Sequence, residues 1–355
     1  MPSRPNVPTS DVRLGYVPAL DGLRAVAITL VVSHHAFGWP AGGWLGVDLF
    51  FVLSGFLITT LLLERRGSES ISGFYRRRAL RLLPALCALL VVALAVDRSL
   101  FGTLAGLGYF SNFLMAAGHP PELPESFAHL WSLAAEEQFY IVWPFVLYGV
   151  IRLGTRVFFS IAAAGALAST LLAFTLFVGG ASGYRLFYAP DTRAAPILVG
   201  CALALGLQIR PLSLARLEIP ALALALALVL TMEYVKLSTS GPPILLFALA
   251  SAVLIVRALR NSSGVRRLLS LGPFVFLGRI SYALYLWHWP LFVWLGVAGG
   301  FELLDLPVIA LAVLLAIGSY YLVERPFLRL KPASPPSNPS RTAIGPEAMP
   351  DLARA

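Results

Sequence analysis

The residues best suited to chemistry lie in one apolar segment near the N-terminus, at about residues 19 to 38. Arg24 and His35 are eleven positions apart, close to three turns of an α-helix, and Asp21 lies one turn before Arg24. The three side chains therefore share a helix face, on which Arg24 and His35 are separated by roughly 16 Å. Because an imidazole can act as a general acid or base near neutral pH, His35 is the candidate catalytic group.

These residues also have a purely structural interpretation. Asp21 and Arg24 would then form an intrahelical ion pair at a membrane interface, and His35 would reach toward the outer headgroups. His34 is rotated by about 100° from His35 around the helix and is not expected to join the same face. Both interpretations stay open for Arg24, whereas the chemistry of imidazole favours a functional role for His35.

A second apolar segment, at about residues 45 to 63, follows after a short Gly-rich turn and reads GVDLFFVLSGF from Gly46. The short turn is expected to place Asp48 near His35, where its carboxylate would orient the imidazole. A carboxylate close to a helix start can instead cap backbone N–H groups, and this alternative stays open. Gly46 and Gly55 are expected to permit close helix packing rather than chemistry.

Guanidinium groups are concentrated in the run FYRRRALRLLP, which starts at Phe74. Arg77 and Arg81 are four positions apart, and Arg78 lies three positions before Arg81, so one helix face carries all three. Such a face suits bidentate binding of phosphate groups. Anchoring against anionic lipid is the structural alternative. The density of the cluster favours a phosphate-bearing ligand.

Two further segments place polar groups inside apolar helices. The first reads HLWSLAAEEQFYIVWP and contains the consecutive residues Glu136, Glu137 and Gln138. Ionisable side chains in a membrane helix are unfavourable unless they are paired or have a functional role. A solvated turn that faces outward would most easily explain Glu137. The second reads GRISYALYLWHWPLFVW and holds His288 between two tryptophans. An interfacial aromatic belt explains the tryptophans, whereas the histidine indicates a functional role.

The composition requires a membrane setting for these residues. Of the 355 residues, 58% are hydrophobic and 13% are charged, whereas soluble domains carry about 25% charge. Apolar runs of about 20 residues match the length that a bilayer requires, so a soluble enzyme is excluded. The net charge of +9 lies in short basic clusters between these runs, and nucleic acid is therefore not an expected partner.

Ten membrane spans are predicted from the apolar runs, which gives an all-α, polytopic helical bundle. Residues 97–128 hold only a weaker apolar stretch and a Pro-rich run, and are expected to form a partly re-entrant or interfacial hairpin. Cys87 and Cys201 lie in separate apolar runs, so neither a disulfide nor a metal site is predicted. The predicted spans cover about 19–38, 45–63, 79–96, 129–151, 157–178, 192–209, 218–235, 244–258, 273–297 and 306–323.

Basic residues predict the orientation, because Lys and Arg accumulate on the cytoplasmic side of short loops. With the N-terminus inside, and with Arg24 and Arg279 inside or beside spans, 21 of the 27 basic residues face the cytoplasm. The four outside are Arg98, Arg185, Arg193 and Lys236. Both termini are therefore predicted to be cytoplasmic, in an inner membrane. Residues 1–15 are assigned to a cytoplasmic N-terminal segment, 16–328 to the membrane domain and 329–355 to a disordered cytoplasmic tail.

Together these segments resemble the acyltransferase 3 family of integral membrane O-acyltransferases, which includes O-antigen acetylases and macrolide acyltransferases. The resemblance covers about residues 16 to 328 and implies transfer of an acyl group, commonly acetyl, from cytoplasmic acyl-CoA to a hydroxyl of a carbohydrate or related acceptor. Acyl-CoA is then a donor substrate, and no tightly bound cofactor is implied. The segments that carry the resemblance are LDGLRAVAI with its spacing from Arg24 to His35, GVDLFFVLSGFLIT, FYRRRALRLLP, HLWSLAAEEQFY, RISYALYLWHWPL and VERPF.

The resemblance also implies roles for individual positions. Arg24 and His35 match the motif regarded as essential in the family. Glu136 matches the acidic position of the segment SLxxEEQFY. The basic run linked to handling of the donor is matched by Arg77, Arg78 and Arg81.

These roles combine into a hypothesis for the reaction. The arginine cluster binds the phosphates of acyl-CoA, and the pantetheine arm follows a continuous hydrophilic track past Asp21 and Arg24 toward His35. His35 removes the proton of the acceptor hydroxyl, while Glu136 or Asp48 fixes the imidazole tautomer. Asp21 and His288 are assigned to substrate binding. A covalent acyl intermediate on Ser54 or a tyrosine stays open.

Two other classes of protein are compatible with parts of the pattern. In a proton-coupled transporter, Asp21, Arg24, His35 and Glu136 would form a relay, as intramembrane ionisable groups often do. A non-catalytic membrane component of an envelope assembly complex is the other alternative. This alternative does not explain why a histidine and a glutamate would be buried in the membrane at a cost in free energy.

Overall fold

The computed structural model describes residues 15–66, 70–233, 239–297 and 305–330, and every regular element among them is helical. The predicted all-α class is thereby confirmed. The predicted disordered tail and the first 14 residues lie outside the described residues, apart from 329–330. In chain order the elements are α1 (Pro18–Phe37), η1 (Gly43–Leu45), α2 (Gly46–Glu64), α3 (Ile71–Asp97), α4 (Leu100–Leu107), α5 (Ser111–Ala116), η2 (Glu125–Phe127), α6 (Leu130–Val150), η3 (Ile151–Leu153), α7 (Thr155–Val178), α8 (Gly183–Tyr188), α9 (Pro190–Ile209), η4 (Ala215–Leu217), α10 (Glu218–Thr231), α11 (Pro242–Leu259), α12 (Gly264–Leu269), α13 (Gly272–Arg279), α14 (Ser281–Leu295), α15 (Asp305–Gly318), the π-helix η5 (Ser319–Glu324) and α16 (Arg325–Arg329).

Six helical stretches of the described chain are long and apolar enough to cross a membrane, so the chain is a multi-pass membrane protein. Helices α1 and α6 also match predicted spans in length, with 20 and 21 residues, but the polar residues that they carry lower their apolar character. The count of ten spans and the cytoplasmic placement of both termini stay predictions. The six stretches are Gly43–Glu64, Ile71–Asp97, Thr155–Val178, Gly183–Ile209, Pro242–Leu259 and Asp305–Arg329.

The predicted single span at 273–297 is wrong in one respect, because two helices, α13 and α14, cover it. They meet at Ile280, whose backbone angles, φ −90° and ψ 1°, leave the helical region. The Ser281 hydroxyl donates to the carbonyl of Gly278 at 2.8 Å and satisfies a carbonyl at this break. A new helix therefore begins at Ser281, and it sets the register of every polar side chain on α14.

The connection at 97–128 contains α4, α5 and η2, and none of them is long enough to cross a bilayer, in agreement with the prediction for this segment. Its two ends are held together by Asp97. The Asp97 carboxylate accepts hydrogen bonds from the Ser126 hydroxyl at 2.7 Å and from the Trp294 indole at 3.0 Å. The connection is thereby fastened to α14, the helix that carries His288.

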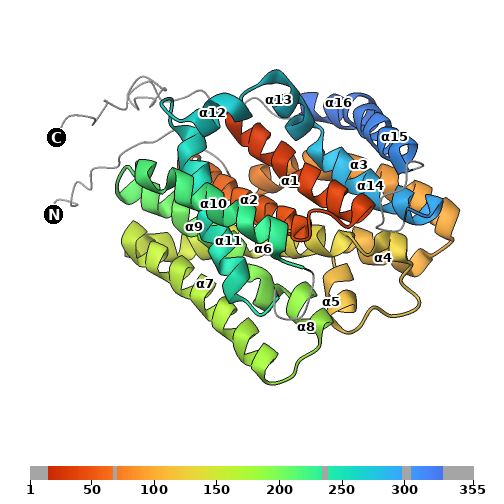
Figure 1. Ribbon diagram of the computed structural model, residues 1–355, viewed down its shortest axis with the longest axis horizontal. Coiled ribbons are helices and arrows are strands. Elements are labelled where there is room, and N and C mark those ends of the chain that lie inside the picture. The colour runs from red at the N-terminus through yellow and green to blue at the C-terminus, as the bar shows by residue number, and fades with distance from the viewer. Residues whose placement is uncertain (1–14, 67–69, 234–238, 298–304, 331–355) are drawn as a thin grey trace.

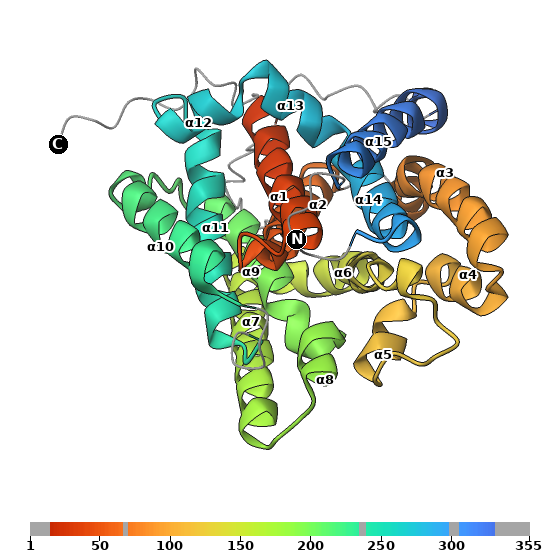
Figure 2. The same cartoon turned by 45° about the vertical axis from the view of Figure 1, so that its right-hand side comes forward.

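The helices form two groups around a central set (Figures 1 and 2). Helices α7, α9, α10 and α11 lie on one side of the molecule, and α3, α14 and α15 lie on the other. Helices α1, α2 and α6 run between the two groups. The segments that carry the candidate residues, although far apart in sequence, therefore meet near the middle of the bundle.

Glycines let the central helices approach to backbone contact. A Cβ atom at position 55 of α2 would lie 2.0 Å from the carbonyl oxygen of Ile197 on α9, and one at Gly200 would lie 2.1 Å from that of Val52. A Cβ atom at Gly46 would lie 2.4 Å from the carbonyl oxygen of Ala27. The predicted packing role of Gly46 and Gly55 is confirmed, since no larger residue fits at these crossings.

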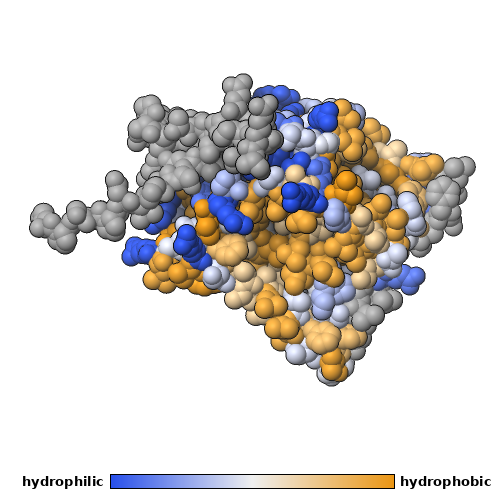
Figure 3. All heavy atoms as spheres, turned by 60° about the vertical axis from the view of Figure 1, so that its left-hand side comes forward, coloured by the Kyte–Doolittle hydropathy of each residue, from blue (hydrophilic) through white to orange (hydrophobic). Residues whose placement is uncertain are grey.

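Large apolar side chains cover much of the outer surface. Figure 3 shows hydrophobic residues over the body of the molecule and hydrophilic residues gathered toward one edge. Because exposure of such a large apolar surface to water is unfavourable, these side chains are expected to face lipid. Examples are Leu167, Leu171 and Phe174 on α7, Ile219, Leu222 and Leu226 on α10, and Leu314 on α15.

Candidate functional site

A cavity of about 370 Å³ lies among α1, α2, α3, α6 and α14. Its apolar wall comes largely from α2, with Phe50, Phe51 and Leu57 among the lining residues. Its charged lining is strongly unequal in sign, because five arginines accompany a single carboxylate there. These charged residues are Arg24, Arg65, Arg77, Arg78, Arg81 and Glu136. A cavity with this excess of guanidinium groups suits an anionic ligand, phosphate above all.

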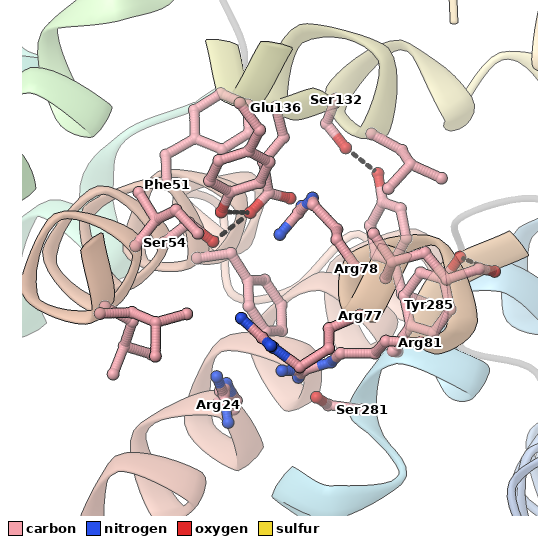
Figure 4. Close-up of a pocket in the computed structure, with 18 of the residues that line it drawn as sticks. Arg24, Phe51, Ser54, Arg77, Arg78, Arg81, Ser132, Glu136, Ser281 and Tyr285 are labelled. Carbon is pink, nitrogen blue, oxygen red and sulfur yellow. Dashed lines mark hydrogen bonds between the residues drawn. The ribbon is translucent and has the colours of Figure 1, made fainter. Parts of the chain in front are cut away.

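The arginines converge from different helices. Figure 4 shows the guanidinium groups of Arg24, Arg77 and Arg81 turned toward one another across the cavity. Arg77 and Arg81 are one turn apart on α3, as the sequence spacing predicts, and Arg24 comes from α1. Bringing like charges together in a partly buried space is unfavourable unless an anion or a carboxylate compensates them.

Arg78 already has a carboxylate partner. Its Nε atom donates to both oxygens of Glu137, at 3.0 and 2.9 Å, and its Nη2 atom donates to Glu137 Oε1 as well. The alternative in which Glu137 lies in a solvated turn is therefore not what the structure shows, because the carboxylate is buried and the partly buried Arg78 on α3 neutralises it. Arg78 also lies over the ring of Tyr140, with 3.3 Å between Cζ and the ring centroid.

Glu136 and Gln138, the neighbours of that carboxylate, point to other partners. The Glu136 carboxylate accepts hydrogen bonds from the Ser54 hydroxyl and from the Tyr140 hydroxyl, the latter at 2.7 Å (Figure 4). The predicted contact of Glu136 with His35 is not the one found, because Glu136 faces the cavity from the middle of α6. Gln138 exchanges side-chain hydrogen bonds with Asn112 at 3.1 and 2.8 Å. The three consecutive polar residues thus serve three separate contacts.

Asp21 and Arg24 form the intrahelical ion pair that the structural interpretation predicts, at 2.8 Å. Asp21 also accepts a hydrogen bond from the Tyr16 hydroxyl at 2.9 Å, and Tyr16 accepts one from Arg279 at the same distance. Asp21 is not among the cavity residues, whereas Arg24 is. The ion pair and the cavity position are compatible, so neither interpretation of Arg24 excludes the other.

Asp48 is fully buried and pairs with Arg193 of α9, with 2.9 and 3.0 Å from Arg193 Nη2 to its two carboxylate oxygens. The predicted contact between Asp48 and His35 is therefore wrong. Arg193 lies in the first turns of α9, within the predicted span 192–209, and only 1% of its surface is exposed. Phe187, Trp44 and Trp131 surround its guanidinium group within 4.7 to 5.9 Å.

His35 instead meets His288, which lies 253 positions away in the sequence. Nδ1 of His35 and Nε2 of His288 are 3.0 Å apart. The Trp289 ring packs against the His35 imidazole at a centroid distance of 4.5 Å, and the His129 ring lies 6.0 Å from that of His288. His288 is completely buried and contacts His35 directly, and its assignment to substrate binding stays a prediction.

The cavity does not extend along the predicted track as far as His35. His35 does not line the cavity, and the lining toward it includes Ser132 and Tyr285. Their hydroxyl oxygens are 2.5 Å apart (Figure 4), and the Tyr285 hydroxyl donates to the carbonyl of His129 at 2.7 Å. The Tyr285 ring is 5.5 Å from the ring of His288. One aromatic layer therefore separates the cationic cavity from the histidine pair.

Several residues of the site escape sequence reasoning. Ser132, Tyr140 and Tyr285 are ordinary members of aromatic-rich helices until the packing brings them to the cavity. Their spacing carries a usable signal, however, because Ser132, Glu136 and Tyr140 repeat every four positions and must share one face of α6. No such signal exists for Arg193. Within the described residues, no three His, Cys, Asp or Glu side chains are grouped to hold a metal ion.

The fold and the site define a multi-pass helical membrane protein with a cationic internal cavity beside a histidine pair. The chain belongs to the acyltransferase 3 family of membrane O-acyltransferases, because the family model described as an acyltransferase domain matches residues 17–324. The family resemblance seen in the sequence is thereby confirmed.

Three relatives are similar in sequence over most of this chain. YrhL of Bacillus subtilis is 35% identical over 314 residues, which is 78% of this chain and 49% of YrhL. The peptidoglycan O-acetyltransferase OatA of Listeria monocytogenes is 33% identical over 307 residues, or 78% of this chain and 49% of that protein. The O-acetyltransferase OatA of Staphylococcus aureus is 31% identical over 351 residues, or 88% and 57%. This chain thus spans about half the length of these relatives, and no solved structure matches it.

Proposed function

We propose that this chain transfers an acetyl group from cytoplasmic acetyl-CoA to a hydroxyl of a cell-envelope carbohydrate, in the inner membrane. The name of the Listeria relative suggests peptidoglycan as the acceptor. The observation that carries the proposal is the cavity with five arginines and one carboxylate, one aromatic layer away from the pair of His35 and the buried His288.

The donor is recognised by its phosphates. In this proposal Arg65, Arg77 and Arg81 bind the phosphate groups of the CoA moiety, since guanidinium groups form bidentate hydrogen bonds with phosphate. Arg24 lines the same cavity from α1, held in place by Asp21. Arg78 contributes less to the donor, because Glu137 already neutralises it. The apolar wall of α2 accommodates the pantetheine arm.

The chemistry is acyl transfer to oxygen. His35 accepts the proton of the acceptor hydroxyl while the oxygen attacks the thioester carbonyl, a general-base contribution of about 10² to 10⁴-fold. A new ester C–O bond forms, the C–S bond breaks, and the CoA thiolate leaves and takes up a proton to become the free thiol. Trp289 packs against His35 and limits its orientation.

In this proposal the aromatic layer at Tyr285 controls access of the donor to His35. Ser132 and Tyr285, which are hydrogen-bonded to each other, line the cavity on the side of His288, the partner of His35. We therefore propose that Tyr285 turns aside when the donor is bound. Such a layer also keeps the cytoplasm and the acceptor side apart between turnovers.

A vesicle assay tests the proposal directly. Inside-out membrane vesicles with the chain are given acetyl-CoA labelled in the acetyl group, and both thiol release and label in carbohydrate are measured. We expect His35→Gln to reduce transfer by about 10²-fold or more, because it lacks a base of suitable pKa. His34→Gln is the matched control, since His34 contacts the carbonyl of Pro40 at 3.1 Å and is not part of the pair. Full transfer by a correctly inserted His35→Gln variant would remove His35 from the mechanism.

The same vesicles separate an enzyme from a transporter. An acyltransferase releases free thiol in proportion to the label that enters the acceptor. Uptake of a solute without any CoA ester, with no thiol release on adding acetyl-CoA, would contradict the proposed function and favour the transporter alternative.

A further inference from the structure

Two hydrogen bonds in series connect the backbone of α14 to His35. Nδ1 of His288 lies 3.0 Å from the carbonyl oxygen of Leu284, one turn earlier on the same helix. Nε2 of His288 lies 3.0 Å from Nδ1 of His35. The two imidazole planes differ by 6° and their centroids are 5.3 Å apart. A centroid separation so much longer than the N···N distance means that the rings meet end to end, with each nitrogen in line with the other.

The direction of both bonds follows from the first acceptor. A carbonyl oxygen only accepts, so Nδ1 of His288 must carry a proton. His288 is completely buried among the rings of His129, Tyr285 and Phe292, and an unpaired imidazolium there would be strongly unfavourable. A neutral imidazole has one N–H, which leaves Nε2 of His288 with its lone pair. This nitrogen can only accept, and the donor is the N–H at Nδ1 of His35.

The remaining nitrogen of His35 is then determined. With its proton on Nδ1, neutral His35 presents an unprotonated Nε2, which is the form a general base requires. We propose that His288 is a positioning residue. Its Nδ1 donates a hydrogen bond to the Leu284 carbonyl, so its Nε2 accepts one from His35 and fixes the His35 tautomer in which Nε2 can take the proton of the acceptor hydroxyl. This inference rests on the proposed function, in which His35 is the general base.

The proton balance of the step involves only His35. Nε2 of His35 gains the hydroxyl proton, Nδ1 keeps its own, and the imidazolium that forms donates a stronger, charge-assisted hydrogen bond to His288. The pair returns to its starting state when the proton leaves Nε2 for the CoA thiolate. His288 exchanges no proton at any stage.

Three substitutions at position 288 separate positioning from packing. The amide of Gln places an oxygen near the position of Nε2, where it can accept from His35, whereas the amide of Asn ends near Nδ1 and cannot reach it. Leu fills similar space without any acceptor. In the vesicle assay we expect His288→Asn and His288→Leu to lower kcat by about 10²-fold and His288→Gln by less than about tenfold. The apparent KM for acetyl-CoA should stay unchanged in all three, because His288 does not line the donor cavity.

The outcomes are distinguishable. If Asn and Gln variants inserted to equal levels are equally active, or if KM changes instead of kcat, His288 acts only through packing and the inference is overturned. Because Asn and Gln are both polar amides, their comparison holds even if the Leu variant fails to fold. Full acetyl transfer by His35→Gln in the same series would instead overturn the assignment of His35 as the general base. Absence of thiol release by the unaltered chain would overturn the proposed function.

Discussion

Arginines inside the helix bundle have two different electrostatic settings. Arg78 and Arg193 are each held by a carboxylate, Glu137 and Asp48 respectively. Arg77 and Arg81 line the cavity, where cations outnumber carboxylates. Substitution in the first group removes an ion pair inside the protein, whereas substitution in the second changes the affinity for an anion. The two groups should therefore differ in stability and in kinetics.

Stability is the property that depends on the pair of Arg78 and Glu137. We expect Glu137→Gln to lower the free energy of unfolding by about 1.5 to 3 kcal/mol, since it replaces the charge-assisted hydrogen bonds to the partly buried Arg78 guanidinium. The loss is measured as earlier thermal unfolding of the detergent-purified protein. Glu122→Gln is the control, because Glu122 is exposed. Equal thermal stability of the two variants would contradict a structural role for the pair.

Donor affinity is the property that depends on Arg77. We expect Arg77→Gln to raise the apparent KM for acetyl-CoA by about tenfold, which corresponds to about 1.4 kcal/mol of lost binding. The comparison is with Arg76→Gln, since Arg76 is the exposed neighbour outside the cavity. An unchanged KM for both variants would return the arginine run to the anchoring interpretation.

Among the helices, the crossing of α2 and α9 is a backbone-to-backbone contact that supports the site. Gly55 and Gly200 let the two backbones touch, and the same pair of helices carries Ser54, Asp48 and Arg193. The cavity wall from α2 is therefore positioned by a contact that lies outside the cavity. A displacement of α2 by one side chain would move Phe51 and Ser54 together.

A larger residue at this crossing should disrupt the bundle. We expect Gly55→Val to reduce the yield of folded protein severely, because its Cβ atom alone would lie 2.0 Å from a carbonyl oxygen. The yield is measured by gel filtration in mild detergent. Gly149→Val on α6 is the matched control, since nothing lies within 4 Å of a Cβ atom there. A normal yield of Gly55→Val would show that α2 and α9 can separate without loss.

For the molecule as a whole, the predicted orientation is testable without the site. An alkaline phosphatase domain, which is active only outside the cytoplasm, is fused after Val178 at the end of α7 or after Arg329 at the end of α16. With ten spans and an inner N-terminus, we expect activity for the first fusion and none for the second. Activity after Arg329 would contradict the cytoplasmic C-terminus and the even number of spans.

Local rules were sufficient for part of the site. The shared face of Asp21, Arg24 and His35, the arginine face of α3 and the packing role of Gly55 all follow from helical periodicity or from residue size. These features depend on contacts within one helix or on the space that one residue occupies. The lengths of apolar runs likewise predict α2, α7 and α11 to within a few residues, because a bilayer imposes a minimum length on a helix.

Helical periodicity and residue size do not predict which polar side chains pair between different helices. The short turn between their helices predicts a contact of Asp48 with His35, but Asp48 bonds to Arg193, 145 positions away. For Glu137 the sequence leaves a solvated turn open as an alternative, but its carboxylate bonds to Arg78.

The amino-acid sequence by itself determined a multi-pass helical membrane protein of the acyltransferase 3 family and the helix faces that carry its polar groups, since periodicity and hydropathy act along the chain. Only the tertiary structure decided which polar groups pair, that His288 meets His35, and that Tyr285 separates them from the cavity. The physical reason is that a hydrogen bond between helices depends on their relative rotation and depth, which packing against all the other helices sets together.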